Sequence, residues 1–274
     1  MTITEQMSYS TVRIETENSE GEKFSGTGYF FVFKKEKNSN RSIPVVITNK
    51  HVVEDAKKGT LVFTLAKNNI PIDQEHFRFN IEDFRNLWTF HPDTNVDLCA
   101  MPIAIFLNEA KNQNKELFFI PLDISLIPDE NVLIKLSAME DIVMVGYPNG
   151  IWDKVNNKPI FRKGVTATHP AKDYNGKKEF LIDAACFPGS SGSPVFILNE
   201  NGYRDNLGNM IMGSARVLFM GTLYAGPQYV ASGNIEIVEV PTVQKPIAQT
   251  SIPNNLGIVI KSIRVKELEA MFGN

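Results

Sequence analysis

The sequence predicts an all-β fold, either a barrel or a sandwich. Short runs of β-branched and aromatic residues, such as 29–33, recur along the chain, and glycine, proline, asparagine and aspartate bound them. Helical periodicity, by contrast, is scarce. The chain has 274 residues, of which 43% are hydrophobic, so it can bury a large core.

The expected strands follow one another from the N-terminus. The segment 10–15 alternates polar and apolar side chains as a half-buried strand does, whereas 29–33 and 44–48 are apolar enough to be buried on both faces. The same criteria place further strands at 61–65, 77–79, 98–105, 142–146, 164–168, 179–182, 194–198, 217–223, 234–239 and 257–260.

Helices and loops take up the rest. One or two helical turns are expected at 52–58, and an amphipathic helix at 262–271 has its apolar residues at helical spacing. Polar composition predicts surface loops at 34–41, 107–115 and 199–209. The segment 241–255 contains three prolines and is expected to be irregular.

The composition excludes several classes of function. The 28 basic residues against 31 acidic ones give a net charge of −3, so nothing indicates nucleic-acid binding. No stretch approaches the roughly 20 apolar residues of a membrane helix, and no secretory signal is visible. Cys99 and Cys186 make no disulfide framework and are expected to be buried thiols. We therefore expect a cytoplasmic protein with no membrane partner.

A cluster of small residues, FPGSSGSP at 187–194, indicates a serine nucleophile at Ser191. Gly189 and Gly192 let the backbone turn tightly, which brings N–H groups close to a substrate carbonyl. A Gly-x-Ser-Gly sequence is equally typical of a purely structural turn. The interpretation therefore depends on partners elsewhere in the chain.

His51 and Asp97 are the candidate partners. His51 follows the apolar segment 44–48, and Asp97 stands at the head of the apolar segment 98–105. A carboxylate buried there would need a hydrogen-bond partner, and an imidazole N–H is a suitable one. Asp93 is the alternative acid, but it lies in a polar turn and is expected to face solvent.

Six segments, in order, resemble the chymotrypsin-type serine proteases and most closely their bacterial HtrA/Deg-like branch. They are GTGYF (26–30), TNKHVV (48–53), DLCA (97–100), VGYPNG (145–150), DAACFPGSSGS (183–193) and LGIVI (256–260). The chain order His, Asp, Ser is also that of the chymotrypsin-type enzymes. The chain ends soon after the last segment, so no PDZ domain of the kind that HtrA proteins carry is expected.

The resemblance implies one trypsin-like peptidase domain over 1–274. It would contain two six-stranded antiparallel β-barrels at 9–115 and 125–260, followed by a C-terminal helix at 261–274. The first barrel would carry His51 and Asp97, and the second would carry Ser191, with the active site in the cleft between them.

The implied activity is that of a serine endopeptidase acting on protein or peptide substrates. Ser191 would be the nucleophile, His51 the general base and Asp97 the group that orients the base. The backbone N–H groups of Gly189 and Ser191 would form the oxyanion hole. The side chain before the cut bond would contact Ala185, Cys186, Thr222, Leu223 and Tyr224. Small or medium apolar side chains are expected there, because Ala185 supplies no acid. No metal or cofactor is expected, since no ligand cluster or phosphate loop is evident.

Regulation and rival functions complete the expectations. Ser190 stands where trypsin has the aspartate that pairs with a freed N-terminus, so we expect control through ordering of the loop 188–190 instead. A regulatory partner could act on the surface loops. The main alternative is a catalytically silent pseudoprotease that serves as a binding module, and a second is a protease restricted to one partner. An α/β-hydrolase would need the order Ser, Asp, His, which is absent.

Overall fold

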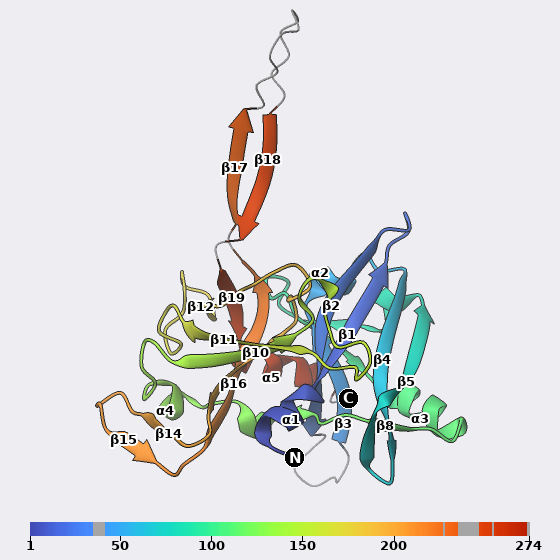
Figure 1. Cartoon of the computed structure of the whole chain (residues 1–274), viewed down its shortest axis with the longest axis horizontal. Helices are drawn as coiled ribbons and strands as arrows, with labels where there is room; N and C mark the ends of the chain where they lie inside the picture. The colour runs from blue at the N-terminus through green and yellow to red at the C-terminus, as the bar shows by residue number, and fades with distance from the viewer. Residues whose placement is uncertain (35–41, 227, 235–246, 254, 273–274) are drawn as a thin grey trace, which may run out of the picture.

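The computed structural model describes residues 1–34, 42–226, 228–234, 247–253 and 255–272. The described chain is mostly β-strand and forms two halves that lie side by side (Figure 1). Strands β1 to β9 make the first half, and a closed barrel makes the second. The predicted all-β class is confirmed.

The first half is a nine-stranded sheet whose main path runs β5-β4-β1-β2-β3-β7-β6. Strand β8 pairs with β4, and β9 pairs in parallel with β2. The strands are β1 (Thr11–Glu17), β2 (Lys23–Lys34), β3 (Ser42–Thr48), β4 (Lys58–Lys67), β5 (Ile70–Glu82), β6 (Thr89–Phe90), β7 (Cys99–Pro102), β8 (Glu116–Phe118) and β9 (Leu122–Asp123).

The second half is a closed antiparallel barrel in the order β10-β11-β12-β19-β16-β13. Its strands are β10 (Asp141–Gly146), β11 (Ile160–Thr166), β12 (Glu179–Asp183), β13 (Pro194–Asn199), β16 (Arg216–Ala225) and β19 (Leu256–Lys261). Two hairpins are added to it, β14 (Gly202–Arg204) with β15 (Met210–Met212), and β17 (Gln228–Asn234) with β18 (Ile247–Pro253). The second hairpin projects far from the body (Figure 1).

The helices are short: α1 (Ile3–Ser8), α2 (Lys50–Val53), α3 (Ala104–Asn112), α4 (Glu130–Leu133) and α5 (Ile263–Glu269), with 3-10 turns at Phe84–Leu87, Ile124–Leu126, Pro148–Gly150 and Ala270–Phe272. A capping box starts α1, because Thr2 and Glu5 satisfy each other's backbone N–H groups. Within the described ranges, no helix has the length and apolarity needed to cross a membrane.

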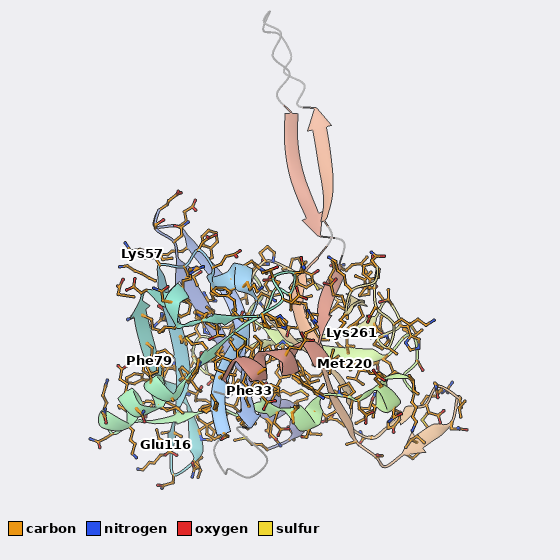
Figure 2. All side chains as sticks on the ribbon, turned by 180° about the vertical axis from the view of Figure 1, so that it is seen from behind. Phe33, Lys57, Phe79, Glu116, Met220 and Lys261 are labelled. Carbon is orange, nitrogen blue, oxygen red and sulfur yellow. The ribbon has the colours of Figure 1, made fainter. Side chains whose placement is uncertain are left out.

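An apolar core joins the two halves. Tyr29 and Phe31 on β2 pack against Phe219 on β16, with ring centroids 5.3 and 6.4 Å apart. The buried Tyr29 hydroxyl also bonds Thr222 Oγ1 at 2.9 Å. Separate clusters fill the interior of each half. Figure 2 shows Phe33, Phe79 and Met220 inside the body and Lys57 and Glu116 at its outer edge. Burial across the junction fixes the two halves relative to each other.

Some predicted elements were wrong. The first half is a nine-stranded sheet instead of a six-stranded barrel, because strands of only two or three residues join it, and these leave no sequence pattern. The strand expected at 98–105 ends at Pro102, and α3 replaces most of the loop expected at 107–115. Phe106 and Ala110, four residues apart, bury one face of that helix.

Two predictions fall partly outside the described residues. Of the strand expected at 234–239, only Asn234 is described, and it ends β17. Of the irregular segment expected at 241–255, residues 247–253 instead form β18. The loop at 34–41 lies outside the described residues except for the end of β2. The expected C-terminal helix is present as α5 and the 3-10 turn that follows it.

Candidate active site

His51 and Asp97 are held together at the junction of the two halves. His51 lies in α2, directly after β3, and Asp97 precedes β7, which pairs with β3. His51 Nδ1 is 2.6 Å from Asp97 Oδ2, and the His51 backbone N–H donates to Asp97 Oδ1 at 3.1 Å. A carboxylate only accepts hydrogen bonds, so Nδ1 carries a proton, and in the neutral imidazole the lone pair is then on Nε2.

Two neighbouring donors hold the backbone at Asp97 and Leu98. Asn49 Nδ2 donates to the Asp97 carbonyl at 2.7 Å, and the His91 N–H donates to the Leu98 carbonyl at 2.9 Å. Asp93, the alternative acid, is instead paired with Arg264 at 2.5 Å. The structure therefore places Asp97 against His51 and directs Asp93 to the C-terminal helix.

Ser191 lies in a loop whose glycines are required by geometry. Gly189 and Gly192 have φ of +84° and +86°, the left-handed region that favours glycine. A Cβ at Gly192 would also overlap the Thr27 carbonyl oxygen and Thr48 Oγ1. Ser190 is buried, and its hydroxyl accepts the Phe187 N–H at 3.4 Å, so this position offers no carboxylate.

Most polar groups of the loop 187–193 are paired. Six of its carbonyl oxygens accept a hydrogen bond. With the donor first, the pairs are Ser190 N and Phe187 O (3.0 Å), Asn149 N and Pro188 O (2.5 Å), Thr27 Oγ1 and Gly189 O (3.0 Å), Ser193 N and Ser190 O (3.0 Å), Thr27 N and Ser191 O (2.9 Å), and Leu223 N and Ser193 O (3.0 Å). Each bond fixes the plane of one peptide unit.

Two backbone donors stay free in this loop. Among residues that the structure describes, the N–H groups of Gly189 and Ser191 donate to no protein acceptor. Because C=O and N–H point in opposite directions in a trans peptide, the bond from Asn149 to Pro188 turns the Gly189 N–H away from the Asn149 turn. Two unpaired donors beside a serine are what a developing oxyanion needs.

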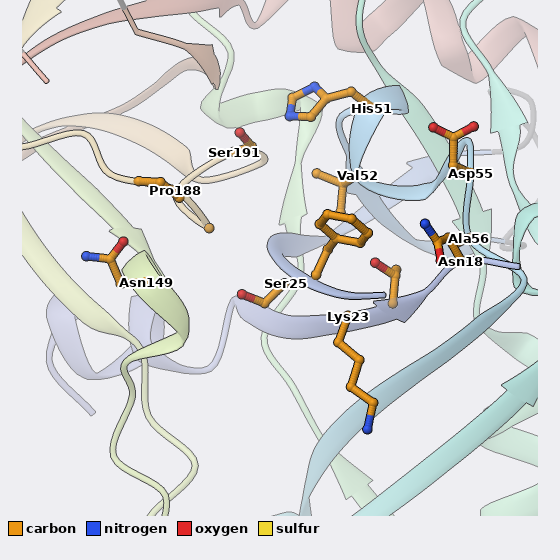
Figure 3. A pocket seen from close by; sticks show the side chains of 13 residues that line it. Asn18, Lys23, Ser25, His51, Val52, Asp55, Ala56, Asn149, Pro188 and Ser191 are labelled. Atoms are coloured by element: carbon orange, nitrogen blue, oxygen red, sulfur yellow. The ribbon is translucent and has the colours of Figure 1, made fainter. Parts of the chain in front are cut away.

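Ser191 and His51 line one cavity of about 550 Å³ (Figure 3). In the described chain the two side chains form no direct hydrogen bond. Such contacts often tighten only when substrate is bound. Gly189 lines the same cavity, and Phe24, Val52 and Ala56 give it apolar surface. The sequence analysis assigned these three residues no role at the site, although Val52 lies within the segment 48–53 and Phe24 stands two residues before the segment 26–30.

A second cavity of about 280 Å³ lies on the barrel side of Ser191. Cys186, Leu223 and Tyr224, all expected at the specificity pocket, line it. Residues that the sequence analysis missed also contribute: Phe187, Pro188, Ser190, Ala225, Gly226 and Leu256. No charged side chain is among its lining residues.

The structure places the other two expected pocket residues elsewhere. The Thr222 side chain is fully buried and faces Tyr29 in the core between the halves. Ala185 is absent from the lining of this cavity, and its carbonyl accepts from Arg162 at 2.5 Å. Alternation along β16 separates Thr222 from Leu223, because neighbouring residues of a strand face opposite sides, whereas Tyr224 lies at a register shift of the strand and also lines the cavity.

Burial raises the pKa of the Cys186 thiol to about 11, with Arg162 opposing the shift and Asp183 adding to it. Cys186 therefore stays a neutral thiol near pH 7 and contributes a small apolar surface to the cavity. Across the described residues, no group of three or more His, Cys, Asp or Glu side chains is placed to hold a metal ion.

The fold and this site define the class of the protein as a serine endopeptidase of the chymotrypsin-like type. Residues 26–202 match the family described as "Trypsin-like peptidase domain". The chain belongs to this family, and the matched part contains His51, Asp97 and Ser191. The predicted family is confirmed.

Three solved structures illustrate what the chain is similar to. The Rv3671c protease from M. tuberculosis, active form, has a TM-score of 0.46 and 14% identity, over 98% of this chain and 82% of that chain. The HtrA-type protease AlgW with tripeptide has 0.47 and 15%, over 98% and 61%. Deg5 has 0.43 and 16%, over 81% of each chain. No curated protein matches the chain.

Proposed function

We propose that this endopeptidase cuts peptide bonds through a triad of Ser191, His51 and Asp97. One arrangement carries the proposal. Asp97 accepts hydrogen bonds from both the backbone N–H and the imidazole of His51, and the unpaired N–H groups belong to Gly189 and Ser191, which line the same cavity as His51. Base, nucleophile and oxyanion donors thus face one space.

The proposed reaction proceeds in two steps. Ser191 Oγ attacks the scissile carbonyl carbon while His51 Nε2 takes the hydroxyl proton, and Asp97 stabilises the resulting imidazolium. The carbonyl oxygen becomes an oxyanion between the N–H groups of Gly189 and Ser191, each of which contributes on the order of 3 kcal/mol to the transition state. His51 then protonates the leaving amine, which leaves an ester on Ser191. Water, deprotonated by His51, hydrolyses this ester.

The two cavities take opposite sides of the bond. His51 must reach the leaving amine, so the cavity that His51 lines receives the residues after the bond. The smaller cavity then receives the side chain before it. Its size and its uncharged lining of Cys186, Leu223 and Leu256 support a preference for small or medium apolar side chains. Profiling with a peptide library tests this, and a preference for Arg or Lys would contradict it.

The proposed activity is tested in a cell lysate. We expect wild-type protein to create new peptide termini that mass spectrometry detects, and Ser191→Ala to create none. Equal termini from both proteins would refute the assignment of Ser191. Failure of folded wild type to cut any protein would favour the pseudoprotease alternative. The cytoplasmic location and a regulatory partner on the surface loops stay predictions.

A further inference from the structure

Thr27 connects the first half of the molecule to the loop that carries Ser191. It lies in β2, and its side chain is fully buried. Its backbone N–H donates to the Ser191 carbonyl at 2.9 Å, and its hydroxyl donates to the Gly189 carbonyl at 3.0 Å. The same hydroxyl accepts the Tyr147 N–H at 3.0 Å. One buried residue thus fixes two alternate peptide units of the nucleophile loop.

Thr27 is also tied to the strand that leads to His51. Thr48 Oγ1 donates to the Thr27 carbonyl at 2.7 Å, and Thr48 ends β3, three residues before His51. A chain of hydrogen bonds therefore runs from the strand before the base, through Thr27, to the loop with the nucleophile. Buried, fully paired networks of this kind hold a unique geometry.

The hydroxyl has a particular task at Gly189. Glycine has little intrinsic preference for one backbone conformation, so the peptide unit after Gly189 depends on its hydrogen bonds: its carbonyl accepts from the Thr27 hydroxyl, and its N–H, that of Ser190, donates to the Phe187 carbonyl. Without the Thr27 hydroxyl, the Gly189 carbonyl and the buried Tyr147 N–H would each lose their partner. The Gly189–Ser190 unit could then rotate toward a new partner, and the adjoining units, which carry the Gly189 and Ser191 N–H groups, would shift with it.

We infer that Thr27 is a positioning residue for the oxyanion hole, and that its hydroxyl fixes the Gly189–Ser190 peptide unit, which joins the two units that carry the Gly189 and Ser191 N–H groups. The inference rests on the proposed function. It concerns a residue that touches neither substrate nor reacting atoms and acts through the Gly189 backbone.

Phosphorylation of Ser191 by diisopropyl fluorophosphate tests this role. In that reaction Ser191 Oγ forms a bond to phosphorus, the P–F bond breaks with loss of fluoride, and His51 receives the hydroxyl proton. The phosphoryl oxygen occupies the oxyanion hole. Because the reagent is small, its rate should depend less on the two substrate cavities than peptide hydrolysis does. The variants are Thr27→Val, which keeps the shape and removes the hydroxyl, and Thr27→Ser, which restores it.

The matched control is Thr166→Val. Thr166 is a buried threonine on β11 whose hydroxyl likewise accepts a backbone N–H, from Glu140 at 2.9 Å, and donates to a carbonyl, that of Ala138 at 2.8 Å. It lines neither cavity at Ser191. Loss of stability alone should therefore affect Thr166→Val and Thr27→Val alike.

We expect Thr27→Val to slow phosphorylation by the reagent by about 10²-fold, the size of losing one oxyanion donor, with Thr27→Ser and Thr166→Val within about threefold of wild type. The midpoint of the rate against pH should not move in Thr27→Val, because His51 and Asp97 are untouched. If Thr27→Val does not fold, Thr27→Ala is measured in its place.

Two results would count against different statements. If wild-type protein is phosphorylated by the reagent but the hydroxyl-free Thr27 variant reacts at the same rate, or if Thr166→Val slows equally, the inference about Thr27 is wrong while the proposed function stands. If folded wild type does not react at all, the proposed function itself fails.

Discussion

Replacing Asp97 by asparagine isolates the role of the acid in the proposed triad. The Asp97 carboxylate accepts two hydrogen bonds from His51, one from the backbone N–H and one from Nδ1. An asparagine of the same shape has only one acceptor oxygen, which the backbone N–H occupies. Its NH₂ group would then face Nδ1. The imidazole would have to carry its proton on Nε2, where it could not accept one from Ser191.

The expected loss follows from this wrong tautomer. In trypsin-like enzymes the corresponding change costs about 10⁴-fold in kcat, or roughly 5 kcal/mol of transition-state free energy. Asp97 lines neither cavity at Ser191, so KM should change little. The assay is steady-state hydrolysis of a peptide p-nitroanilide selected by library profiling, with kcat and KM measured separately.

Asp93→Asn is the matched control for Asp97→Asn. Asp93 lies four residues earlier in the same segment, but its carboxylate pairs with Arg264 and not with His51. We expect kcat within about threefold of wild type, because no catalytic hydrogen bond is lost. The reasoning is refuted if Asp97→Asn keeps more than about a tenth of the wild-type kcat, or if Asp93→Asn loses as much as Asp97→Asn.

Three further predictions concern stability and reactivity. Gly192→Ala should lower the free energy of unfolding, measured in urea, by about 2–5 kcal/mol, because it adds a clash to backbone strain. The control Gly176→Ala, where φ is +76° and the space around an added Cβ is open, should lower it by only about 1 kcal/mol. Equal losses of stability in the two variants would contradict this prediction. The thiol of Cys186, with a pKa of about 11, should be only about 10⁻³ ionised at pH 8, so iodoacetamide should alkylate it far more slowly than an ordinary thiol. Rapid labelling at pH 7 would contradict this raised pKa. Burial, and after it the charge of Arg264, lowers the pKa of His91. The contribution of neutral His91 to the free energy of unfolding is therefore complete above its pKa in the unfolded chain, about 6.5, and is lost as pH falls below that value. The free energy of unfolding should therefore drop between pH 7 and 5 more in wild type than in His91→Gln, and parallel curves would refute this.

Local motifs carried most of what could be predicted about the site. The chemistry of a serine protease depends on residue types that must occur in fixed sequence neighbourhoods, such as the glycines around Ser191. The structure places His51 against Asp97, whereas Asp93 pairs with Arg264. Arg264 lies near the end of the chain, so no local sequence pattern could have predicted that it pairs with Asp93.

The missed features depend on contacts between distant segments. Thr222 was expected at the specificity pocket, but its side chain faces Tyr29, almost two hundred positions earlier in the chain. Phe24 lines the larger cavity only because β2 passes beside the nucleophile loop. Strands of two or three residues, such as β6 and β9, are set by pairing partners rather than by their own composition.

In the first half, local polarity also misled the prediction of loops. The segment 107–115 is polar on average, yet Phe106 and Ala110 bury one face of α3 against the sheet. A helix needs only a narrow apolar stripe to pack, so mean polarity does not exclude it. The stripe becomes evident only when the window begins before residue 107.

The convergence of Ser191, His51 and the two free N–H groups is tested most directly by a crystal structure of the adduct with a peptidyl boronic acid. We expect a bond between boron and Ser191 Oγ, with one boron oxygen about 3 Å from the N–H groups of Gly189 and Ser191, and His51 Nε2 within hydrogen-bond distance of the adduct. An adduct on another residue, or an imidazole turned away from the boron with both N–H groups unoccupied, would contradict the proposed mechanism.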